Sequence, residues 1–248
     1  MFDAKRAAEG CIQWTRNWFD KNGKGCVAVV GISGGKDSSV VGGICVKALG
    51  PERVIGVMMP NHTQADIQDS KDIIDFLGIK SYQFNIGGII DKFHWQFEKD
   101  CADLTATQQA DENLPPLVRL EVLRYIAKCT NGRVSKNCNA SETHIGYTTV
   151  DGDNRGDFAP IRDFVVSEVI EIGRCIGMPE RFLVKAPADG LCGKTDEDKL
   201  GIPYAVLDRY LRTGEIDDLE IKAKIDRMHE MNKFKDMPTA YYKYWKNK

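Results

Sequence analysis

Apolar residues along the first third of the chain switch between short continuous runs and helical spacing. Residues 27–32 form a run rich in β-branched side chains and bounded by turn residues, which predicts a buried strand. From Ser39 the apolar positions follow helical spacing up to Gly50-Pro51, which predicts a helix. The same reasoning predicts a second strand, a helix and a third strand over 53–59, 64–77 and 81–86. Strands that alternate with helices predict an α/β fold, a Rossmann-like, doubly wound parallel sheet with helices on both faces.

The rest of the chain predicts mostly helices, interrupted by two long polar loops. The expected helices cover 3–21 before the first strand, then 89–101, 116–129 and 165–176, with two more within 203–233. A further strand is expected over 133–138, and the polar loops over 148–160 and 185–202. Because no repeat, low-complexity tract or linker divides the sequence, we expect one domain spanning 1–248.

The turn after the first strand has the sequence Ser33-Gly34-Gly35-Lys36-Asp37-Ser38. Its glycines let the backbone approach a ligand, and the free N–H groups at the start of the helix attract an anion. The Walker A pattern requires serine or threonine after Gly-Lys, and here Asp37 follows, so that pattern is excluded. A carboxylate beside a phosphate is favourable if it holds Mg²⁺. The alternative is an ordinary glycine turn with a solvated Lys-Asp pair.

Composition and charge narrow the class of protein. The chain has 248 residues, long enough to bury a core without disulfides, and its net charge of −2 predicts neither nucleic-acid nor anionic-membrane binding. Its eight cysteines contain no C-x-x-C pair, and its four histidines show no zinc-ligand spacing. The N-terminus lacks the apolar core of a signal peptide, and no run is long enough to span a membrane. We therefore expect a cytoplasmic protein with reduced thiols.

With these motifs in place, the chain resembles the ammonia-dependent NAD synthetases, members of the N-type ATP pyrophosphatases (adenine nucleotide alpha hydrolase-like) with an S-G-G-x-D-S signature. The signature alone also fits GMP synthetases, asparagine synthetase-type enzymes and tRNA-modifying relatives. The order and spacing of later blocks narrow the choice. These blocks are MPNHTQAD (59–66), NLPPLVRLEVL (113–123), CNASE (138–142), GYTTVDGDNRGDFAP (146–160), KAPADGLCGKTDEDKLGI (185–202) and NKFKDMP (232–238).

The resemblance implies a two-step ligase reaction with ATP as co-substrate and Mg²⁺ as the metal. The carboxylate of deamido-NAD attacks the α-phosphate of ATP, which forms a mixed anhydride with AMP and releases pyrophosphate. Ammonia then attacks the activated carbonyl, which releases AMP and leaves the amide of NAD. The chain has no fused glutaminase domain, so free ammonia or ammonia from a separate protein is the implied nitrogen source. The resemblance also implies a homodimer, with no nucleic-acid or membrane partner.

The resemblance assigns roles to residues of this chain. It implies that Lys36 and Asp37 are catalytic, and that Asp37 and Glu142 are the metal ligands. The implied ATP site consists of Gly31, Ile32, Ser33, Gly34, Gly35, Lys36, Asp37, Ser38 and Asn137. The implied site for the acceptor substrate consists of Asp157, Phe234, Lys235 and Arg119.

Some positions depart from the pattern of that family. Leu117 stands where members usually carry arginine, and Val150 where they carry lysine or arginine, so two cations expected at the dinucleotide are missing. Asn137 replaces a threonine that usually contacts ATP. Two alternatives therefore stay open: an ATP pyrophosphatase that amidates or adenylates a different carboxylate, and a nucleotide-binding protein without catalysis.

Overall fold

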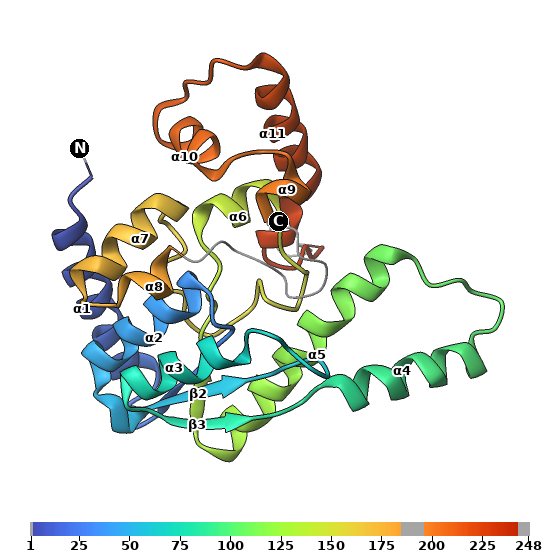
Figure 1. The fold of residues 1–248 in the computed structure, drawn as a ribbon, viewed down its shortest axis with the longest axis horizontal. Helices are drawn as coiled ribbons and strands as arrows, with labels where there is room; N and C mark the ends of the chain where they lie inside the picture. Colours follow the sequence, from blue (N-terminus) through green and yellow to red (C-terminus); the bar gives the residue numbers. More distant parts are fainter. Residues whose placement is uncertain (1, 185–195, 243–248) are drawn as a thin grey trace, which may run out of the picture.

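Four parallel strands in the order β3-β2-β1-β4 form the centre of the computed structural model, which describes residues 2–184 and 196–242 (Figure 1). The strands are β1 (Val27–Gly31), β2 (Val54–Met58), β3 (Lys80–Gln83) and β4 (Gly132–Val134). In register, Ala28 of β1 lies opposite Val54 of β2 and Arg133 of β4. The predicted parallel α/β fold is confirmed. Because the strand order reverses at β1, the crevice beyond the carboxyl ends of β1 and β4 is where such sheets bind ligands.

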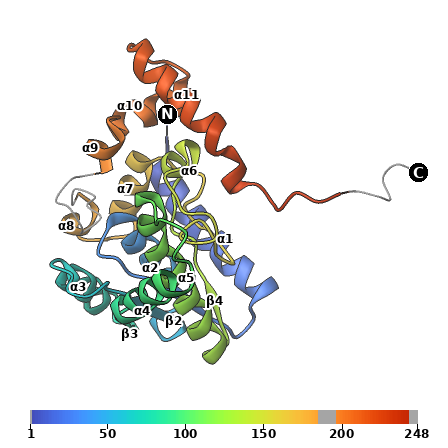
Figure 2. The same ribbon diagram turned by 90° about the vertical axis from the view of Figure 1, so that its right-hand side faces the viewer.

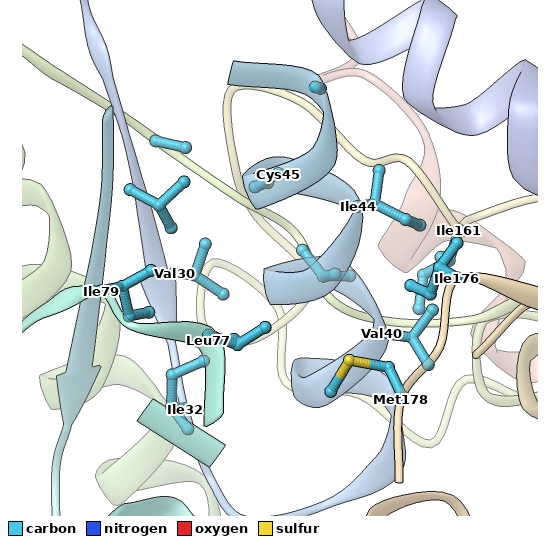
Figure 3. Packing of buried hydrophobic residues seen from close by; sticks show 14 of the residues in the cluster. Val30, Ile32, Val40, Ile44, Cys45, Leu77, Ile79, Ile161, Ile176 and Met178 are labelled. Carbon is cyan, nitrogen blue, oxygen red and sulfur yellow. The ribbon is translucent and has the colours of Figure 1, made fainter. Parts of the chain in front are cut away.

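Two apolar clusters cover the two faces of the sheet. Ala28 and Val30 belong to one cluster and Val29 to the other, as expected for alternate positions of a strand. In Figure 3, Val30, Ile32 and Leu77 of the first cluster lie together beside α2. The first cluster is completed by α1 (Ala4–Asn22), α2 (Lys36–Leu49), α3 (Ile67–Leu77), α7 (Val166–Cys175) and α8 (Glu180–Leu183), and the second by α4 (Gly87–Asp100) and α5 (Gln108–Cys129).

The C-terminal helices form a separate layer over the carboxyl edge of the sheet. They are α6 (Ala140–Ile145), α9 (Asp196–Leu200), α10 (Tyr204–Thr213) and α11 (Leu219–Asn232), which share a third apolar cluster around Ile145, Leu207 and Ile225. A buried carboxylate on α10 joins this layer to the body: Asp208 accepts hydrogen bonds from Ser141 Oγ at 2.6 Å and Ser167 N at 2.7 Å. This layer therefore holds α6 in place.

The chain leaves the body of the protein after the short helix that follows α11. This 3₁₀ helix, η2 (Lys233–Asp236), follows α11 directly and still contacts the body. A second 3₁₀ helix, η1 (Pro51–Arg53), precedes β2. Figure 2 shows the chain after η2 running away from the other elements. Among the described residues, no helix combines the length and apolar character that crossing a membrane requires.

α4 and the first part of α5 project from the body as an arm, which we define as residues 87–114 (Figure 1). Large apolar side chains of the arm are exposed: Phe93 is 52% exposed, Trp95 50% and Leu104 59%. A cavity of about 240 Å³ between the two helices is lined by Phe93, Phe97, Leu104 and Leu114 among others. The arm thus presents an apolar surface away from the sheet.

The structure corrects several of the element boundaries predicted from the sequence. α5 begins at Gln108, not at residue 116, because Thr107 caps it by accepting a hydrogen bond from Ala110 N at 3.2 Å. The sequence-based prediction started the helix at Pro116 because proline is common in the first turn of a helix. In the structure Pro115 and Pro116 lie inside α5. The predicted strand 133–138 already ends at Val134, and the sequence pattern missed α6 and α8. The predicted loop 185–202 contains α9, while 185–195 lie outside the described residues.

Candidate active site

The glycine turn lies between β1 and α2, at the carboxyl edge of the sheet, as predicted. Gly34 has φ +88°, a conformation that L side chains rarely adopt, and a Cβ there would come within 3.2 Å of Asp69 Cβ. Ser38 Oγ accepts a hydrogen bond from Ser33 N at 3.3 Å and donates one to Gly35 O at 3.0 Å. These contacts fix the loop so that the N-terminus of α2 lies open to an anion.

Lys36 and Asp37 occupy the first turn of α2 and form an ion pair. The Lys36 Nζ atom lies 3.1 Å from Asp37 Oδ2, and Lys36 is only 5% exposed. Burial by itself lowers the pKa of Lys36, but the negative charges of Asp37 and Glu142 more than offset this, so its pKa is raised. Lys36 is therefore a permanent buried cation, which suits the binding of phosphate.

The loop after β4 meets the glycine turn and is tied to it by side chains. Asn137 Nδ2 donates to Gly31 O at 3.0 Å, and Asn137 Oδ1 accepts from Ser135 Oγ at 2.7 Å. Glu142 follows in the first turn of α6. The carboxyl ends of β1 and β4 thus bring together the residues that the sequence predicted for ATP and metal, although they are more than a hundred positions apart.

Asp37 and Glu142 lie close enough for their charges to interact. Burial and, to a lesser extent, the negative charge of Asp37 raise the pKa of Glu142 to about 8, against the opposing charge of Lys36. A carboxylate with this pKa carries a proton near neutral pH unless a cation replaces that proton. The pair is therefore poised to accept either a proton or a metal ion.

The chemistry of this pair fits Mg²⁺. In proteins, Mg²⁺ is usually bound by one or two carboxylates together with substrate phosphates and water, rather than by a full cage of side chains. In 2–184 and 196–242, no group of three or more histidine, cysteine, aspartate or glutamate residues is placed to hold a metal. Two carboxylates beside a phosphate-binding loop match the magnesium mode, and this supports Asp37 and Glu142 as the ligands.

Two buried polar residues at this edge were not identified from the sequence. Asn139 is fully buried and caps α6, and its spacing from Glu142 is a capping-box signal that could have revealed it. Tyr204 is 4% exposed, and its hydroxyl has no hydrogen-bond partner in the described part of the chain. Its ring centroid lies 5.5 Å from Lys36 Nζ. Nothing in the local sequence distinguished Tyr204 from an ordinary core tyrosine.

The predicted acceptor residues on the body make contacts with the ends of strands. Asp157 Oδ2 accepts from Val134 N at 2.8 Å, and its Oδ1 accepts from Arg124 Nη1 at 2.5 Å. Arg119 Nε donates to Met59 O at 3.1 Å, and burial lowers the pKa of Arg119. These two residues therefore contact the end of β4 and the residue that follows β2.

The other two predicted acceptor residues belong to η2, beside the polar loop 146–160. Lys235 Nζ donates to Gly146 O at 2.8 Å and to Thr148 O at 3.1 Å, and Phe234 is 61% exposed. Val150, on the same loop, is 36% exposed. The contacts of Lys235 therefore join η2 to the start of this loop.

Comparisons with known proteins agree on one family. The chain matches the family model described as NAD synthase over residues 8–241. It is 38% identical to the NH(3)-dependent NAD(+) synthetase of Methanococcus aeolicus over 206 residues, which covers 79% of this chain and 77% of that protein. It is 37% identical to the enzyme of the same name from Pyrococcus horikoshii over 212 residues, 85% of this chain and 79% of that protein.

Solved structures with the same fold include two enzymes named for different activities. An NMN synthetase from Francisella tularensis superposes with a TM-score of 0.89 at 26% identity, covering 98% of this chain and 100% of that chain. An NH3-dependent NAD synthetase from Campylobacter jejuni, solved with a nitrate ion, gives a TM-score of 0.79 at 24% identity with the same coverage, which shows the shared fold.

Proposed function

The chain belongs to the NAD synthase family, and from this membership we infer that it is a ligase that amidates deamido-NAD to NAD, using ATP and ammonia and releasing AMP and pyrophosphate. The observation that carries the proposal is the meeting of two loops at one edge of the sheet. There the buried cation Lys36, the open N-terminus of α2 and the carboxylates of Asp37 and Glu142 converge. That arrangement suits the binding of a triphosphate.

In the first step, a carboxylate oxygen of the acceptor attacks the α-phosphorus of ATP, and the bond from that phosphorus to the bridging oxygen of the β-phosphate breaks. The electron pair leaves with pyrophosphate. Lys36 and the N–H groups at the start of α2 stabilise the negative charge that gathers there. Ammonia then attacks the carbonyl carbon, loses a proton and expels AMP.

We assign Asp37 and Glu142 as the residues that hold Mg²⁺. When bound, the ion supplies electrostatic neutralisation of the phosphate oxygens. The chain's own contribution is to orient both carboxylates: Asp37 is fixed by Lys36 and Asn139, and Glu142 by the cap of α6.

Product analysis tests the reaction type. The full chain is incubated with deamido-NAD, ammonium, Mg²⁺ and ATP, and the nucleotides are separated. We expect NAD, AMP and pyrophosphate in equal amounts. Without ammonium, pyrophosphate release should stop after about one turnover, because the adenylated acceptor stays on the protein. ADP as the main product would contradict the assignment.

A second candidate acceptor is nicotinate mononucleotide, which yields NMN. The similarity to the Francisella NMN synthetase favours it, and so does the small number of cations available around the predicted acceptor site. Leu117 and Val150 provide no charge, and Arg155 is paired with Asp151 at 2.8 Å. A mononucleotide carries one phosphate, whereas a dinucleotide carries a diphosphate, so the smaller acceptor requires fewer cations.

A competition assay separates the two acceptors. Equal concentrations of deamido-NAD and nicotinate mononucleotide are supplied with limiting enzyme, and the ratio of NAD to NMN gives the ratio of their kcat/KM values. An excess of NAD supports the first candidate. An excess of NMN supports the second, with the same phosphoryl chemistry at Lys36 and Asp37.

We propose further that two copies of the chain form a homodimer through the arm. The exposed apolar residues Phe93, Trp95 and Leu104 support this, because exposed patches of large apolar side chains mark interaction surfaces. The mass of the full chain in solution, measured by light scattering, tests the proposal: 27.8 kDa is the mass of one chain, and a particle of that mass would contradict a dimer.

We also propose a cytoplasmic location and a single functional domain. The seven cysteines in the described part of the chain are free thiols, which supports a reducing compartment. One family model covers residues 8–241, which supports one domain.

A further inference from the structure

Asn139 lies between the two carboxylates assigned to the metal. It is the N-cap of α6, and its side chain and backbone are fully buried. Its Oδ1 atom accepts from Glu142 N at 3.0 Å, and its backbone N–H donates to Glu142 Oε2 at 3.3 Å. Its Nδ2 atom donates to Asp37 Oδ1 at 3.1 Å. One residue thus contacts both carboxylates.

The orientation of the Asn139 amide follows from its partners. The backbone N–H of Glu142 can only donate, so the amide oxygen must face it, and the amide nitrogen must then face Asp37. Lys36 holds the other oxygen of Asp37, Oδ2. Asp37 is therefore held on one side by Lys36 of its own helix and on the other by Asn139, and the hydrogen bond from Asn139 is the one that links it to the helix of Glu142.

This link sets the geometry of two like charges. Two ionised carboxylates that lie close together repel one another, and an unrestrained side chain would rotate away from the other. The amide of Asn139 is neutral, so it restrains Asp37 without adding charge. It also restrains Glu142 through the capping box, which couples the position of one carboxylate to that of the other.

We propose that Asn139 is a positioning residue that holds Asp37 and Glu142 at the spacing a divalent cation requires. This inference rests on the proposed function, in which these carboxylates bind the metal. The helix cap and the restraint on Asp37 use different atoms of Asn139, so they can be separated by substitution. A serine at 139 can still cap α6, but a hydroxyl that caps the helix cannot also occupy the place of Nδ2.

The experiment uses Mn²⁺ as a probe for the divalent cation. Free Mn²⁺ is measured by electron paramagnetic resonance during titration of the full chain in the presence of α,β-methylene-ATP. The variants are Asn139→Ser, which keeps the cap, and Asn139→Ala, which loses it. Asn22→Ser, at the exposed end of α1, is the matched control. Melting temperatures are recorded for every variant.

We expect Mn²⁺ affinity to fall about tenfold or more in both Asn139 variants, because a hydrogen bond to a charged group is commonly worth that factor. The melting temperature should fall further in Asn139→Ala than in Asn139→Ser, since only the alanine removes the cap. In turnover, Asn139→Ser should need more Mg²⁺ for half-maximal rate and recover most of its kcat at saturating Mg²⁺. Asn22→Ser should match the unmodified chain.

Wild-type Mn²⁺ affinity in Asn139→Ser would overturn the inference. Equal affinity in the unmodified chain and in Asp37→Ala would overturn both the inference and the metal assignment of the proposed function. Mn²⁺ binding that depends on Asp37 and Asn139, in a chain that amidates neither nicotinate acceptor, would uphold the positioning role and overturn the proposed reaction.

Discussion

The carboxyl edge of the sheet and the arm depart from ordinary burial in opposite directions. At the edge, Lys36 is 5% exposed, and partial burial together with the charge of Asp37 raises the pKa of Glu142 to about 8. On the arm, Phe93 and Trp95 are each about half exposed. Charged residues are rarely buried and contiguous large apolar residues are rarely exposed, so each region carries a free-energy cost in the isolated chain.

The difference shows what each region lacks. Buried charges are favourable only when they are paired, and the edge supplies two carboxylates and one lysine whose pairing is completed by phosphates and a cation. Exposed apolar side chains are favourable when another apolar surface covers them. In our proposals, a polar ligand completes the edge and a second copy of the chain covers the arm.

Removing one charge from the edge should have the largest effect. Asp37→Ala should lower turnover by at least about a hundredfold, because one lost electrostatic stabiliser of a developing anion typically costs ~3–4 kcal/mol. The fold should survive, since Asp37 lies at a turn. Steady-state kinetics at saturating Mg²⁺ and the melting temperature check this.

Asp20→Ala is the matched control for that experiment, because Asp20 is an exposed aspartate on α1. It should keep normal turnover. A near-normal rate in Asp37→Ala would show instead that the carboxylate is a solvated turn residue. The carboxyl edge would then not depend on Asp37 to bind a polar ligand.

Introducing a charge on the arm should have the next largest effect, and on assembly rather than chemistry. Trp95→Glu should weaken dimerisation by roughly thirtyfold, since truncating an aromatic anchor of an interface costs about 2 kcal/mol or more. Sedimentation across a dilution series measures this. Trp14→Glu is the control, because Trp14 is 44% exposed but lies on α1, away from the arm. Equal dimer strength in both variants would place the interface elsewhere.

The sequence predicted the fold and the edge better than the arm, for a physical reason. β1 and the turn after it combine a β-branched run, glycines and a helix start within fifteen residues, so local rules define them. The pairing of Asp37 with Glu142 came from the family resemblance, because Glu142 by itself has the pattern of a surface helix residue. The parallel arrangement of β1 and β4, whose carboxyl ends lie at the same edge, explains why the two residues are close in the fold.

Other features depended on contacts between distant segments. The role of the Asn139 amide depends on its contact with Asp37, and that of Tyr204 on its contact with Lys36. The sequence around Asn139 and around Tyr204 gives no sign of either contact. Phe93 and Trp95 follow helical spacing with other apolar residues, so the sequence could not distinguish a buried face from an exposed one. α6 has six residues, too few for periodicity to reveal.

Introducing an arginine at Leu117, on α5, should have a moderate effect on the choice between the two acceptor substrates. Leu117, on α5, is 36% exposed, so an arginine there can reach an anionic ligand. Leu117→Arg should lower KM for deamido-NAD about tenfold, because a hydrogen bond to a charged group is worth roughly 1.5 kcal/mol at the low end. KM for ATP should barely change, and preference should shift towards the dinucleotide over nicotinate mononucleotide.

Leu219→Arg supplies the control for that measurement, since it adds the same charge at an exposed leucine on α11. It should leave both KM values unchanged. If Leu117→Arg also leaves them unchanged while the unmodified chain already binds deamido-NAD at micromolar concentration, other residues have replaced the missing cation.

The smallest expected effect is a pH dependence of stability that belongs to the edge and not to the arm. The pKa of Glu142 is about 8 in the folded chain against its ordinary 4.5, so between these values the folded state holds a proton that the unfolded state has released. The free energy of unfolding therefore falls as pH rises through this window, and the contribution is complete below it. In EDTA, the melting temperature should fall by a few degrees between pH 5 and 8, as each kcal/mol shifts it by about 2–4 °C at this chain length.

Glu142→Gln should flatten this dependence of the melting temperature on pH, and Mg²⁺ with ATP should restore stability at pH 8. Glu98→Gln, on the arm, is the control and should leave the pH dependence as it is. An unchanged slope in Glu142→Gln would show that the proton is held elsewhere at this edge, where burial also raises the pKa of Asp153.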